Sequence, residues 1–403
     1  MLTLDKFEEA CEKVKEVTLE TKLVYSDFLS NQTGNKVYLK PENMQFTGAY
    51  KLRGAYYKIS TLTDEERSRG LITASAGNHA QGVAYAAKCY GCKAVIVMPT
   101  TTPLIKVNRT KSYGAEVVLV NGVYDDAYKK ARELEKEEQR VFIHPFDDED
   151  VIAGQGTIGL ELLEQLPDMD AVIVPIGGGG LIAGLAFAIK SLNPKVKVYG
   201  VQVAGAPSMV NAVQHGLIEE LAAVTTFADG IAVKRPGDTT FELVKSYVDE
   251  VVTVTDDEVA SAVLALIERQ KLIAEGAGAV AVAAAMFGKV DIKGKKAVCL
   301  VSGGNIDVNI LSRVITRGLV KAGRFVNLCI ALTDKPGQLE LVSKTIAEFG
   351  GNVVSVQYNR SDENMAINSC FLSLQVETRD YAQIEEIKQA LNERGLRVVP
   401  GRG

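Results

Sequence analysis

The sequence predicts an α/β fold over about its first 315 residues, followed by a smaller α+β unit. In the first region, short apolar runs rich in β-branched residues alternate with helical patterns, which is typical of parallel strands buried on both faces. After Arg324 apolar residues alternate with polar ones, as in strands with only one buried face. At roughly 150 residues per domain, a chain of this length has room for two or three hydrophobic cores.

The expected strands of the first region are apolar runs separated by helical segments. They cover residues 37–39, 71–73, 94–98, 117–120, 171–176, 196–201, 251–254 and 297–301. Strands that alternate with helices in this way predict a mainly parallel sheet with helices on its faces. Ligands of such sheets bind beyond the carboxyl ends of the strands, so the residues that follow each run are the candidates for binding a ligand.

The last part of the chain predicts the order β-α-β-β-α-β, which is the ferredoxin-like module. Its expected elements are a strand over 326–332, a helix over 338–349, strands over 352–358 and 367–376, a helix around 384–391 and a strand over 396–399. We therefore expect a first region over 1–317 and a second domain over 326–403. The linker between them, 318–325, contains two glycines and two basic residues and is expected to form a hinge.

The overall composition argues against several classes of protein. The formal net charge is −5, which gives no electrostatic basis for binding nucleic acid or an anionic membrane. The longest stretch of small apolar residues, 277–288, is too short to cross a bilayer. The N-terminal segment is acidic and has no apolar signal core, so we expect a cytoplasmic protein.

Two of the six cysteines, Cys89 and Cys92, form a CxxC pair. A structural zinc site needs a second pair of ligands, and the other cysteines are scattered singly. Gly91, between the two, is typical of the end of a helix. We therefore predict a structural role for this pair and no metal.

Four consecutive glycines, Gly177 to Gly180, follow the strand expected over 171–176, and Leu181 leads from them into a helical segment. Glycines let backbone N–H groups turn inward, and the positive end of the next helix adds to them, which favours a bound phosphate. The spacings of the Walker A and dinucleotide-binding motifs are not met. The alternative is a flexible turn between a strand and a helix.

Polar residues also follow two other expected strands. Ser302 comes directly after the run 297–301, although an ordinary Ser-Gly turn would explain a serine there equally well. Residues 75–79 follow the run 71–73, where N–H groups at a helix start can hold a carboxylate. His79 in this segment is more often a structural residue of a helix start than a general base.

Lys51 stands among small and aromatic neighbours. Desolvation in such surroundings would lower the pKa of its amine and make it nucleophilic. A phosphate cradle, a reactive lysine, a carboxylate-binding turn and a neutral polar residue at another strand end together match the needs of pyridoxal 5'-phosphate. That cofactor requires a lysine for its Schiff base, a phosphate site and a partner for its ring nitrogen.

Six segments that contain these residues closely resemble the threonine dehydratase (threonine ammonia-lyase) family of fold-type II pyridoxal-phosphate enzymes. They are TGAYKLRGA around Lys51, SAGNHAQG from Ser75, IAGQGTIGLE from Ile152, PIGGGGLIAG from Pro175, EGAGA from Glu275 and SGGN from Ser302. The resemblance covers residues 1 to about 315. It implies two lobes, a large one over 1–45 and 146–317 and a small one over 46–145.

The resemblance also implies roles for the candidate residues. Lys51 would form the Schiff base, Ser302 would face the ring nitrogen, and Glu275 would lie near the ring. The other cofactor contacts would come from Asn78 at the ring hydroxyl and from Gly177, Gly178, Gly179, Gly180 and Leu181 at the phosphate. The substrate carboxylate would be held by Ser75, Ala76, Gly77, Asn78 and His79.

The implied reaction is β-elimination of water from L-threonine, and from L-serine as a second substrate, with ammonia released; threonine gives 2-oxobutyrate. The freed amine of Lys51 would remove the Cα proton. Two alternatives stay open: a serine dehydratase or racemase of the same family, and an amino-acid sensor without catalysis. Racemase relatives typically have a second serine where this chain has Ala76, and the intact Lys51 argues against a sensor.

The tail, with DKPGQL from Asp334, resembles an ACT domain, a regulatory module that binds amino acids. We expect it to bind isoleucine or valine at the turn and helix start formed by Asp334, Gly337, Gln338 and Leu339. ACT modules typically pair side by side, so the resemblance implies a homodimer or homotetramer. The alternative is a tail that only assembles the oligomer.

A metal site is not expected. Racemase relatives tend to carry acidic cation ligands after the strand that this chain has over 196–201. The matching positions here are Gln202 and Ser208, whose side chains carry no charge. Neutral side chains at these positions argue against a divalent cation.

Overall fold

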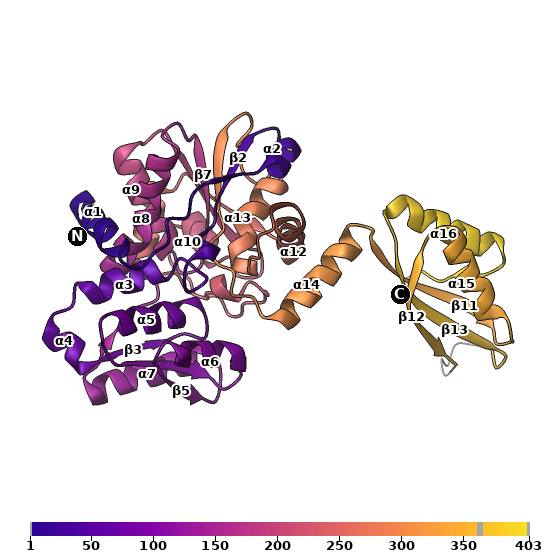
Figure 1. The fold of residues 1–403 in the computed structure, drawn as a ribbon, viewed down its shortest axis with the longest axis horizontal. Helices are drawn as coiled ribbons and strands as arrows, with labels where there is room; N and C mark the ends of the chain where they lie inside the picture. The colour runs from indigo at the N-terminus through magenta and orange to yellow at the C-terminus, as the bar shows by residue number, and fades with distance from the viewer. Residues whose placement is uncertain (1, 361–365, 401–403) are drawn as a thin grey trace. The chain divides into compact units, whose positions relative to one another are not determined.

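The computed structural model describes residues 2–360 and 366–400 and divides into two compact units, Met1–Leu311 and Ser312–Gly403 (Figure 1). The first unit holds two largely parallel sheets, and the second holds an antiparallel sheet. This is the mixed α/β fold that the alternating apolar runs predict. The central strands of the first unit are buried along their length, as their continuous apolar sequences require.

The larger sheet of the first unit contains, in spatial order, β1 (Val24–Tyr25), β2 (Lys36–Lys40), β10 (Lys296–Leu300), β7 (Ala171–Pro175), β8 (Lys197–Val203) and β9 (Glu250–Val254). The edge pair β1 and β2 is antiparallel, and the other neighbours run parallel. Apolar side chains such as Val172, Val198 and Val298 form the core on this sheet. The two-residue strand β1 is too short to show a pattern in the sequence.

The helices of this lobe are α1 (Leu4–Val14), α2 (Asp27–Thr33), α8 (Glu149–Gln165), α9 (Gly180–Leu192), α10 (Ser208–His215), α11 (Asp238–Tyr247), α12 (Asp256–Ala265) and α13 (Gly276–Met286). Helices α8 and α9 pack backbone against backbone. A Cβ on Gly184 would lie 2.1 Å from the carbonyl oxygen of Ile152, so this close crossing needs glycine. The crossing places the start of α9, and with it the glycine loop, beside the residues that precede α8.

The smaller sheet of the first unit contains β5 (Glu116–Val120), β4 (Ala94–Pro99), β3 (Leu71–Ala74) and β6 (Val141–Phe142), all parallel. The helices of this lobe are α3 (Leu52–Ser60), α4 (Asp64–Arg69), α5 (Asn78–Cys89), α6 (Leu104–Ser112) and α7 (Tyr124–Glu138). Alternate residues of β4 serve two cores. Ile96 and Met98 pack in the core that contains α5, and Val95 and Val97 pack in the core that contains α7.

The second unit contains β11 (Phe325–Thr333), α15 (Gln338–Glu348), β12 (Asn352–Asn359), β13 (Ser369–Glu377), α16 (Tyr381–Glu393) and β14 (Arg397–Val398). Its antiparallel sheet has the spatial order β12-β13-β11-β14. The order along the chain is β-α-β-β-α-β, in agreement with the sequence. Buried residues alternate along β13, from Cys370 to Val376, because the helices cover one face of this sheet.

The prediction of a linker over 318–325 is wrong at its start. Helix α14 spans Val308–Lys321 and passes through Gly318, which is buried inside the helix rather than at a hinge. The helix ends only near Gly323, which adopts a positive φ of 68° and lies against Tyr381. The sequence showed two glycines, and only the second one has the left-handed conformation that ends a helix.

A buried cluster of charged side chains joins the two lobes of the first unit. Arg53 of α3 has no exposed surface and donates to both carboxylate oxygens of Glu42, at 2.8 and 2.9 Å. It also donates to Glu161 of α8, at 2.5 and 3.0 Å. Lys40, at the end of β2, donates to Glu161 at 2.5 Å and to the carbonyl of Thr21 at 2.6 Å. Two cations and two carboxylates therefore neutralise one another in the interior.

The two cations of the cluster keep Glu42 ionised. Burial alone would raise the pKa of Glu42, but Arg53 and Lys40 hold that pKa below its ordinary value. Because the cluster contains Arg53, it fixes the start of α3 against α8 and β2. Lys51 lies two residues before Arg53, so the same contacts determine where the amine of Lys51 can lie.

Replacement of Glu161 by alanine should leave Lys40 without its carboxylate and Arg53 with one of its two. We expect a loss of about 3–5 kcal/mol in the free energy of unfolding, the usual cost of an uncompensated buried charge. Urea unfolding followed by circular dichroism measures it. Glu164→Ala, an exposed position of the same helix, is the control and should cost less than about 0.5 kcal/mol. Equal midpoints for the two variants would show that the cluster does not stabilise the fold.

Candidate active site

Lys51 lies at the start of α3 with its side chain half-buried between the lobes of the first unit. Its Nζ donates a 2.7 Å hydrogen bond to the carbonyl oxygen of Pro145 and lies 5.5 Å from the centre of the Tyr50 ring. Burial lowers the pKa of the amine to about 8. A substantial fraction of Lys51 is therefore neutral near physiological pH, as a nucleophile or base requires.

The backbone before Lys51 is attached to the segment that follows β10. The N–H of Tyr50 donates to the carbonyl of Ser302 at 3.1 Å, and the N–H of Gly304 donates to Gly48 at 2.9 Å. A further bridge pairs Ala49 with Gly303. The Ser302 segment and the Lys51 segment, which are about 250 residues apart in the chain, therefore lie side by side.

The glycine loop connects β7 to α9. None of the N–H groups of residues 177–181 donates a hydrogen bond to another residue that the structure describes. A Cβ on Gly178 would lie 2.4 Å from the ring of Phe146, and one on Gly180 would lie 2.6 Å from the carbonyl oxygen of Phe146. Gly179 has a φ of 101°, which other residues rarely adopt. The loop is thus a tightly packed turn whose N–H groups remain available for an anion.

Two adjacent residues, Pro145 and Phe146, contact the amine and this loop respectively. Pro145 accepts the hydrogen bond from Lys51, and its neighbour Phe146 packs against Gly178 and Gly180. The structure therefore brings together an amine of lowered pKa and a set of unpaired N–H groups. This arrangement fits pyridoxal phosphate, which needs a lysine and a phosphate cradle at the two ends of one small molecule.

Asn78, the first residue of α5, lies beside Glu275, the residue that precedes α13. Its Nδ2 donates to Oε1 of Glu275 at 2.5 Å, and its Oδ1 accepts from Nδ2 of Asn305 at 2.9 Å. Glu275 is only 3% exposed, and burial, together with the charge of Asp229, raises its pKa to about 7. The second hydrogen of the Asn78 amide remains free to reach a ligand.

Ser302 is buried and lies two residues after the end of β10. Its hydroxyl lies 3.3 Å from the carbonyl oxygen of Ala277, a long contact that the rotation of the hydroxyl can release. The group is neutral and carries a single proton. A basic nitrogen that faces it would receive a weak hydrogen bond and no full charge.

The segment Ser75–His79 forms the turn from β3 into α5. The hydroxyl of Ser75 accepts the N–H of Gly77 at 3.2 Å. The N–H groups of Asn78 and His79 have no acceptor among the described residues, as expected at a helix start. Ala76 is half-buried in the same turn. These N–H groups could bind a carboxylate close to Lys51.

His79 is buried, and its Nε2 donates to the carbonyl of Ile143 at 3.0 Å. Burial and the nearby charge of Lys51 lower its pKa to about 3, so the ring is neutral. This arrangement supports a structural role for the ring in preference to a general base. Its Nδ1 has no partner within the described part of the chain.

Sequence reasoning missed two parts of the site. The segment His144–Asp147 follows β6, which has only two residues and leaves no periodic pattern. Nδ1 of His144 accepts the N–H of Asp147 at 2.8 Å, and burial lowers the pKa of the ring to about 4. Asn305 was visible as the last residue of SGGN, but its contacts with two other segments had no sequence signal.

The positions considered for a cation are used differently. The side-chain oxygen of Gln202 accepts the N–H groups of Met209 and Val210, at 2.8 and 2.9 Å, and so stabilises the start of α10. The hydroxyl of Ser208 lies 3.4 Å from the amide nitrogen of Gln202. Over residues 2–360 and 366–400, no group of three or more His, Cys, Asp or Glu side chains could hold a metal ion.

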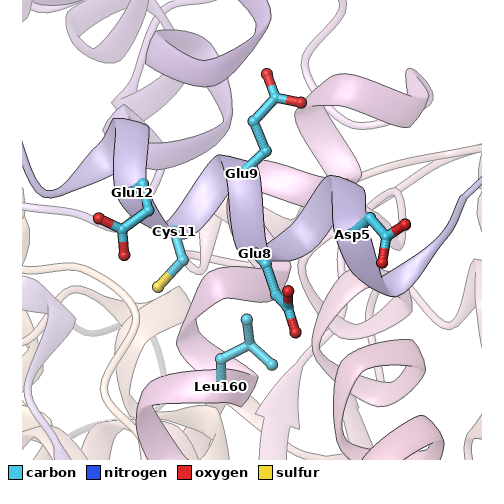
Figure 2. Close-up of a pocket in the computed structure, with 6 residues that line it drawn as sticks. All are labelled: Asp5, Glu8, Glu9, Cys11, Glu12 and Leu160. Atoms are coloured by element: carbon cyan, nitrogen blue, oxygen red, sulfur yellow. The ribbon is translucent and has the colours of Figure 1, made fainter.

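An open pocket of about 520 Å³ lies elsewhere, beside α1. Its lining contains none of the candidate site residues and consists of Asp5, Glu8, Glu9, Cys11, Glu12 and Leu160. Figure 2 shows that the carboxylates of Glu8, Glu9 and Glu12 point in different directions from α1. Because these groups do not converge, the pocket offers no arrangement for catalysis. None of the described helices is long and apolar enough to span a membrane.

Comparison with known proteins identifies the family. The model of the pyridoxal-phosphate dependent enzymes matches residues 14–303. This chain belongs to that family. An L-threonine ammonia-lyase of Thermotoga maritima is 51% identical over 398 residues, which cover 99% of this chain and 99% of the relative. The relative therefore matches both units of the chain.

Two solved structures extend this comparison. The processed form of threonine deaminase isoform 2 from Solanum lycopersicum is 42% identical with a TM-score of 0.75, over 78% of this chain and 93% of that one. A serine racemase from maize is 35% identical with a TM-score of 0.74, over 79% of this chain and 98% of that one. Pyridoxal phosphate is the cofactor of this family, in agreement with the sequence prediction.

The raised pKa of Glu275 predicts a pH-dependent stability of the cofactor-free protein. The native carboxyl keeps its proton up to about pH 7, whereas the unfolded one loses it near 4.5. Stability should therefore fall as the pH rises through this window, by up to about 3 kcal/mol. Glu275→Gln should remove this loss, so its thermal midpoint should exceed that of the wild type more at pH 8 than at pH 5.

Glu164→Gln, at an exposed position, is the matched control and should not show this change with pH. If the wild type and Glu275→Gln keep the same difference in midpoint at both pH values, Glu275 is not held protonated in the native state.

Proposed function

We propose that this protein is an L-threonine ammonia-lyase that eliminates water from L-threonine and, less specifically, from L-serine. The observation that carries the proposal is that two adjacent residues, 145 and 146, contact the Lys51 amine and the glycine loop, so that both lie at one place. The similarity to an L-threonine ammonia-lyase over 99% of the chain supports the choice of substrate. We assign the activity to residues 1–317, with a large lobe over 1–45 and 146–317 and a small lobe over 46–145.

When bound, pyridoxal phosphate supplies a conjugated ring that accepts electron density from the Cα of the amino acid. Lys51 would attach the cofactor, and the N–H groups of residues 177–181 would hold its phosphate. In the loaded enzyme, Nζ of Lys51 would be the base that removes the Cα proton. A pKa near 8 suits this task, because part of the amine is neutral at physiological pH.

The remaining residues orient the reacting groups. The free N–H groups at the start of α5 would bind the substrate carboxylate, and the free hydrogen of the Asn78 amide would face the ring hydroxyl. Ser302 would lie at the ring nitrogen. Because its hydroxyl is neutral, it does not stabilise a protonated ring, and this favours elimination over transamination.

A racemase of the same family is the nearest alternative, because the maize serine racemase shares the fold at 35% identity. Racemisation needs a second acid–base group on the face of the substrate opposite Lys51. The turn Ser75–His79 offers only the methyl group of Ala76 at the position where racemase relatives have a serine. This difference favours the dehydratase.

Lys51→Ala should lower kcat for 2-oxobutyrate formation from threonine by at least about a thousandfold, because Lys51 would both attach the cofactor and remove the Cα proton. The visible absorbance of the lysine-bound cofactor should disappear as well. Lys111→Ala, at an exposed position of α6, is the control and should keep both. Substantial turnover in a preparation of the Lys51 variant that contains no wild-type protein would contradict the role proposed for Lys51.

Ala76→Ser should introduce an acid–base group opposite Lys51 and raise the conversion of L-serine to D-serine above the wild-type trace. Chiral chromatography of the reaction measures this conversion, and the 2-oxo acid product is assayed in the same samples. If D-serine does not increase while the variant stays folded and active, position 76 does not distinguish the two reactions.

We also propose that residues 326–403 form an ACT domain that binds isoleucine or valine and modulates the enzyme. The turn between β11 and α15 supports this proposal. Gly337 has a φ of 89°, and the N–H groups of Gln338 and Leu339 have no acceptor among the described residues. Asp334 in the same turn pairs with Arg360 at 2.7 Å. These groups could receive the carboxylate and the amine of an amino acid.

The same unit supports a homodimer or homotetramer. Strand β12 lies at the edge of its sheet, so its outer side has no partner strand in the described part of the chain. Its side chains Val354, Val356 and Tyr358 are partly exposed. An unpaired edge strand with apolar side chains favours pairing with a second copy.

Isoleucine or valine should change the activity of the full-length protein and raise its thermal midpoint. A chain that ends at Arg324 should keep activity and lose both effects. Activity and midpoint are titrated with isoleucine, valine, threonine and serine. If none of the four amino acids changes either quantity in the full-length protein, the second unit is structural and the regulatory proposal is wrong.

A further inference from the structure

A chain of hydrogen bonds leads from an exposed arginine to the candidate cofactor site. Nη1 of Arg109 donates to Oδ1 of Asn305 at 2.6 Å. Nδ2 of Asn305 donates to Oδ1 of Asn78 at 2.9 Å, and Nδ2 of Asn78 donates to Glu275 at 2.5 Å. Arg109 lies on α6 of the small lobe, whereas Asn305 follows β10 of the larger sheet. The hydrogen bonds therefore pass between the lobes three times, from Arg109 to Asn305, back to Asn78 and again to Glu275.

The direction of each bond follows from the chemistry of the groups. A guanidinium can only donate, so the atom of Asn305 that faces Arg109 must be its oxygen. The Asn305 nitrogen then points toward Asn78 and also donates to the carbonyl of Thr47 at 2.7 Å. Asn78 must present its oxygen to Asn305, which leaves its nitrogen toward Glu275 and the site.

Asn305 is held closely at this junction. A Cβ on Gly48 would lie 2.4 Å from Oδ1 of Asn305, so the absence of a side chain at position 48 makes room for the amide. Rotation of the amide by 180° would place NH₂ against the guanidinium and a carbonyl oxygen against that of Thr47. Both new contacts would be repulsive, so Arg109 and the Thr47 carbonyl together favour one of the two amide orientations.

We propose that Arg109 is a positioning residue that acts across the lobes, through Asn305, to hold the Asn78 amide with its free hydrogen toward pyridoxal phosphate. The inference rests on the proposed site in one respect, namely that Asn78 contacts the cofactor. It extends that site to a residue on the surface of the small lobe. It also gives the lobe-to-lobe contact at Arg109 a function that the surface ion pair between Lys234 and Asp125 does not share.

An ion pair between the lobes serves as a matched control for the contact at Arg109. Lys234, which lies between β8 and α11, pairs with Asp125 of α7 at 2.9 Å. This ion pair also joins the larger lobe to the smaller one at the surface. Among the described residues, the hydrogen-bond chain of Asn305, Asn78 and Glu275 includes neither member of this pair. Loss of a lobe-to-lobe contact in general can therefore be separated from loss of the Arg109 contact.

The experiment titrates cofactor-free protein with pyridoxal phosphate and follows the visible absorbance of the bound cofactor. Arg109→Ala should weaken cofactor binding about three- to fivefold, since exposed charged contacts have effects of this size. Arg109→Lys, which keeps a donor with a positive charge, should recover most of the affinity. Lys234→Ala should bind like the wild type.

A second arm tests the path through Asn305. In an Asn305→Ala background, Arg109→Ala should have no further effect on cofactor affinity, because the intermediate group is missing. Equal affinities for wild type and Arg109→Ala would overturn the inference, and so would an undiminished effect of Arg109→Ala in the Asn305→Ala background. An equal loss in Lys234→Ala would also overturn it, because any contact between the lobes would then suffice.

The titration needs no substrate, so its outcome does not depend on the proposed reaction. If threonine is not converted but Arg109→Ala weakens cofactor binding as stated, the function is wrong and the inference holds. If threonine is converted normally and cofactor affinity does not change in Arg109→Ala, the function holds and the inference is wrong.

Discussion

Arg53 places a guanidinium where no water reaches it, and the geometry of the site depends on how that charge is compensated. Its partners, Glu42 and Glu161, come from the segment after β2 and from α8. Removal of a buried charge from water costs several kcal/mol unless charged hydrogen bonds replace the lost hydration. The start of α3 therefore has little freedom to move. Lys51 lies at that start, so its backbone is fixed by the same contacts. Its amine donates a hydrogen bond to the carbonyl oxygen of Pro145.

The site around Lys51 is built from the ends of strands in both lobes. The glycine loop follows β7, the Ser302 segment follows β10, and the turn Ser75–His79 follows β3. Parallel strands place these ends at one edge of each sheet, where helix starts leave N–H groups unpaired. Charges inside the site are kept low in another way. Burial lowers the pKa of Lys51 and raises that of Glu275, which shifts each group toward its neutral form.

The sequence predicted those parts of the molecule that leave a local pattern. Buried parallel strands appear as continuous apolar runs, and the four glycines after β7 have few structural explanations other than a close turn. The short strands β1 and β6 were missed because two residues cannot show a period. Gly318 was placed in the linker because a glycine buried inside a helix looks the same in sequence as one that ends it.

Contacts between distant segments could not be predicted in this way. The bond from Arg109 to Asn305 joins residues 196 positions apart, and neither residue type is unusual in its surroundings. The same is true of Pro145, whose carbonyl accepts the bond from Lys51, and of Phe146 beneath the glycine loop. The roles given to Ser302, Asn78 and the α5 turn stay predictions. The structure brings these residues close to Lys51 through contacts that no spacing in the sequence encodes.

We propose that Lys51, held by the Arg53 cluster, carries the cofactor. Reduction of the holoenzyme with borohydride, followed by proteolysis and mass spectrometry of the peptides, identifies the lysine that does so. Reduction makes the bond between the cofactor and its lysine permanent. We expect the mass of the reduced cofactor on the peptide that contains Lys51 and on no other. Modification of a different lysine, or of none in protein that has bound the cofactor, would contradict it.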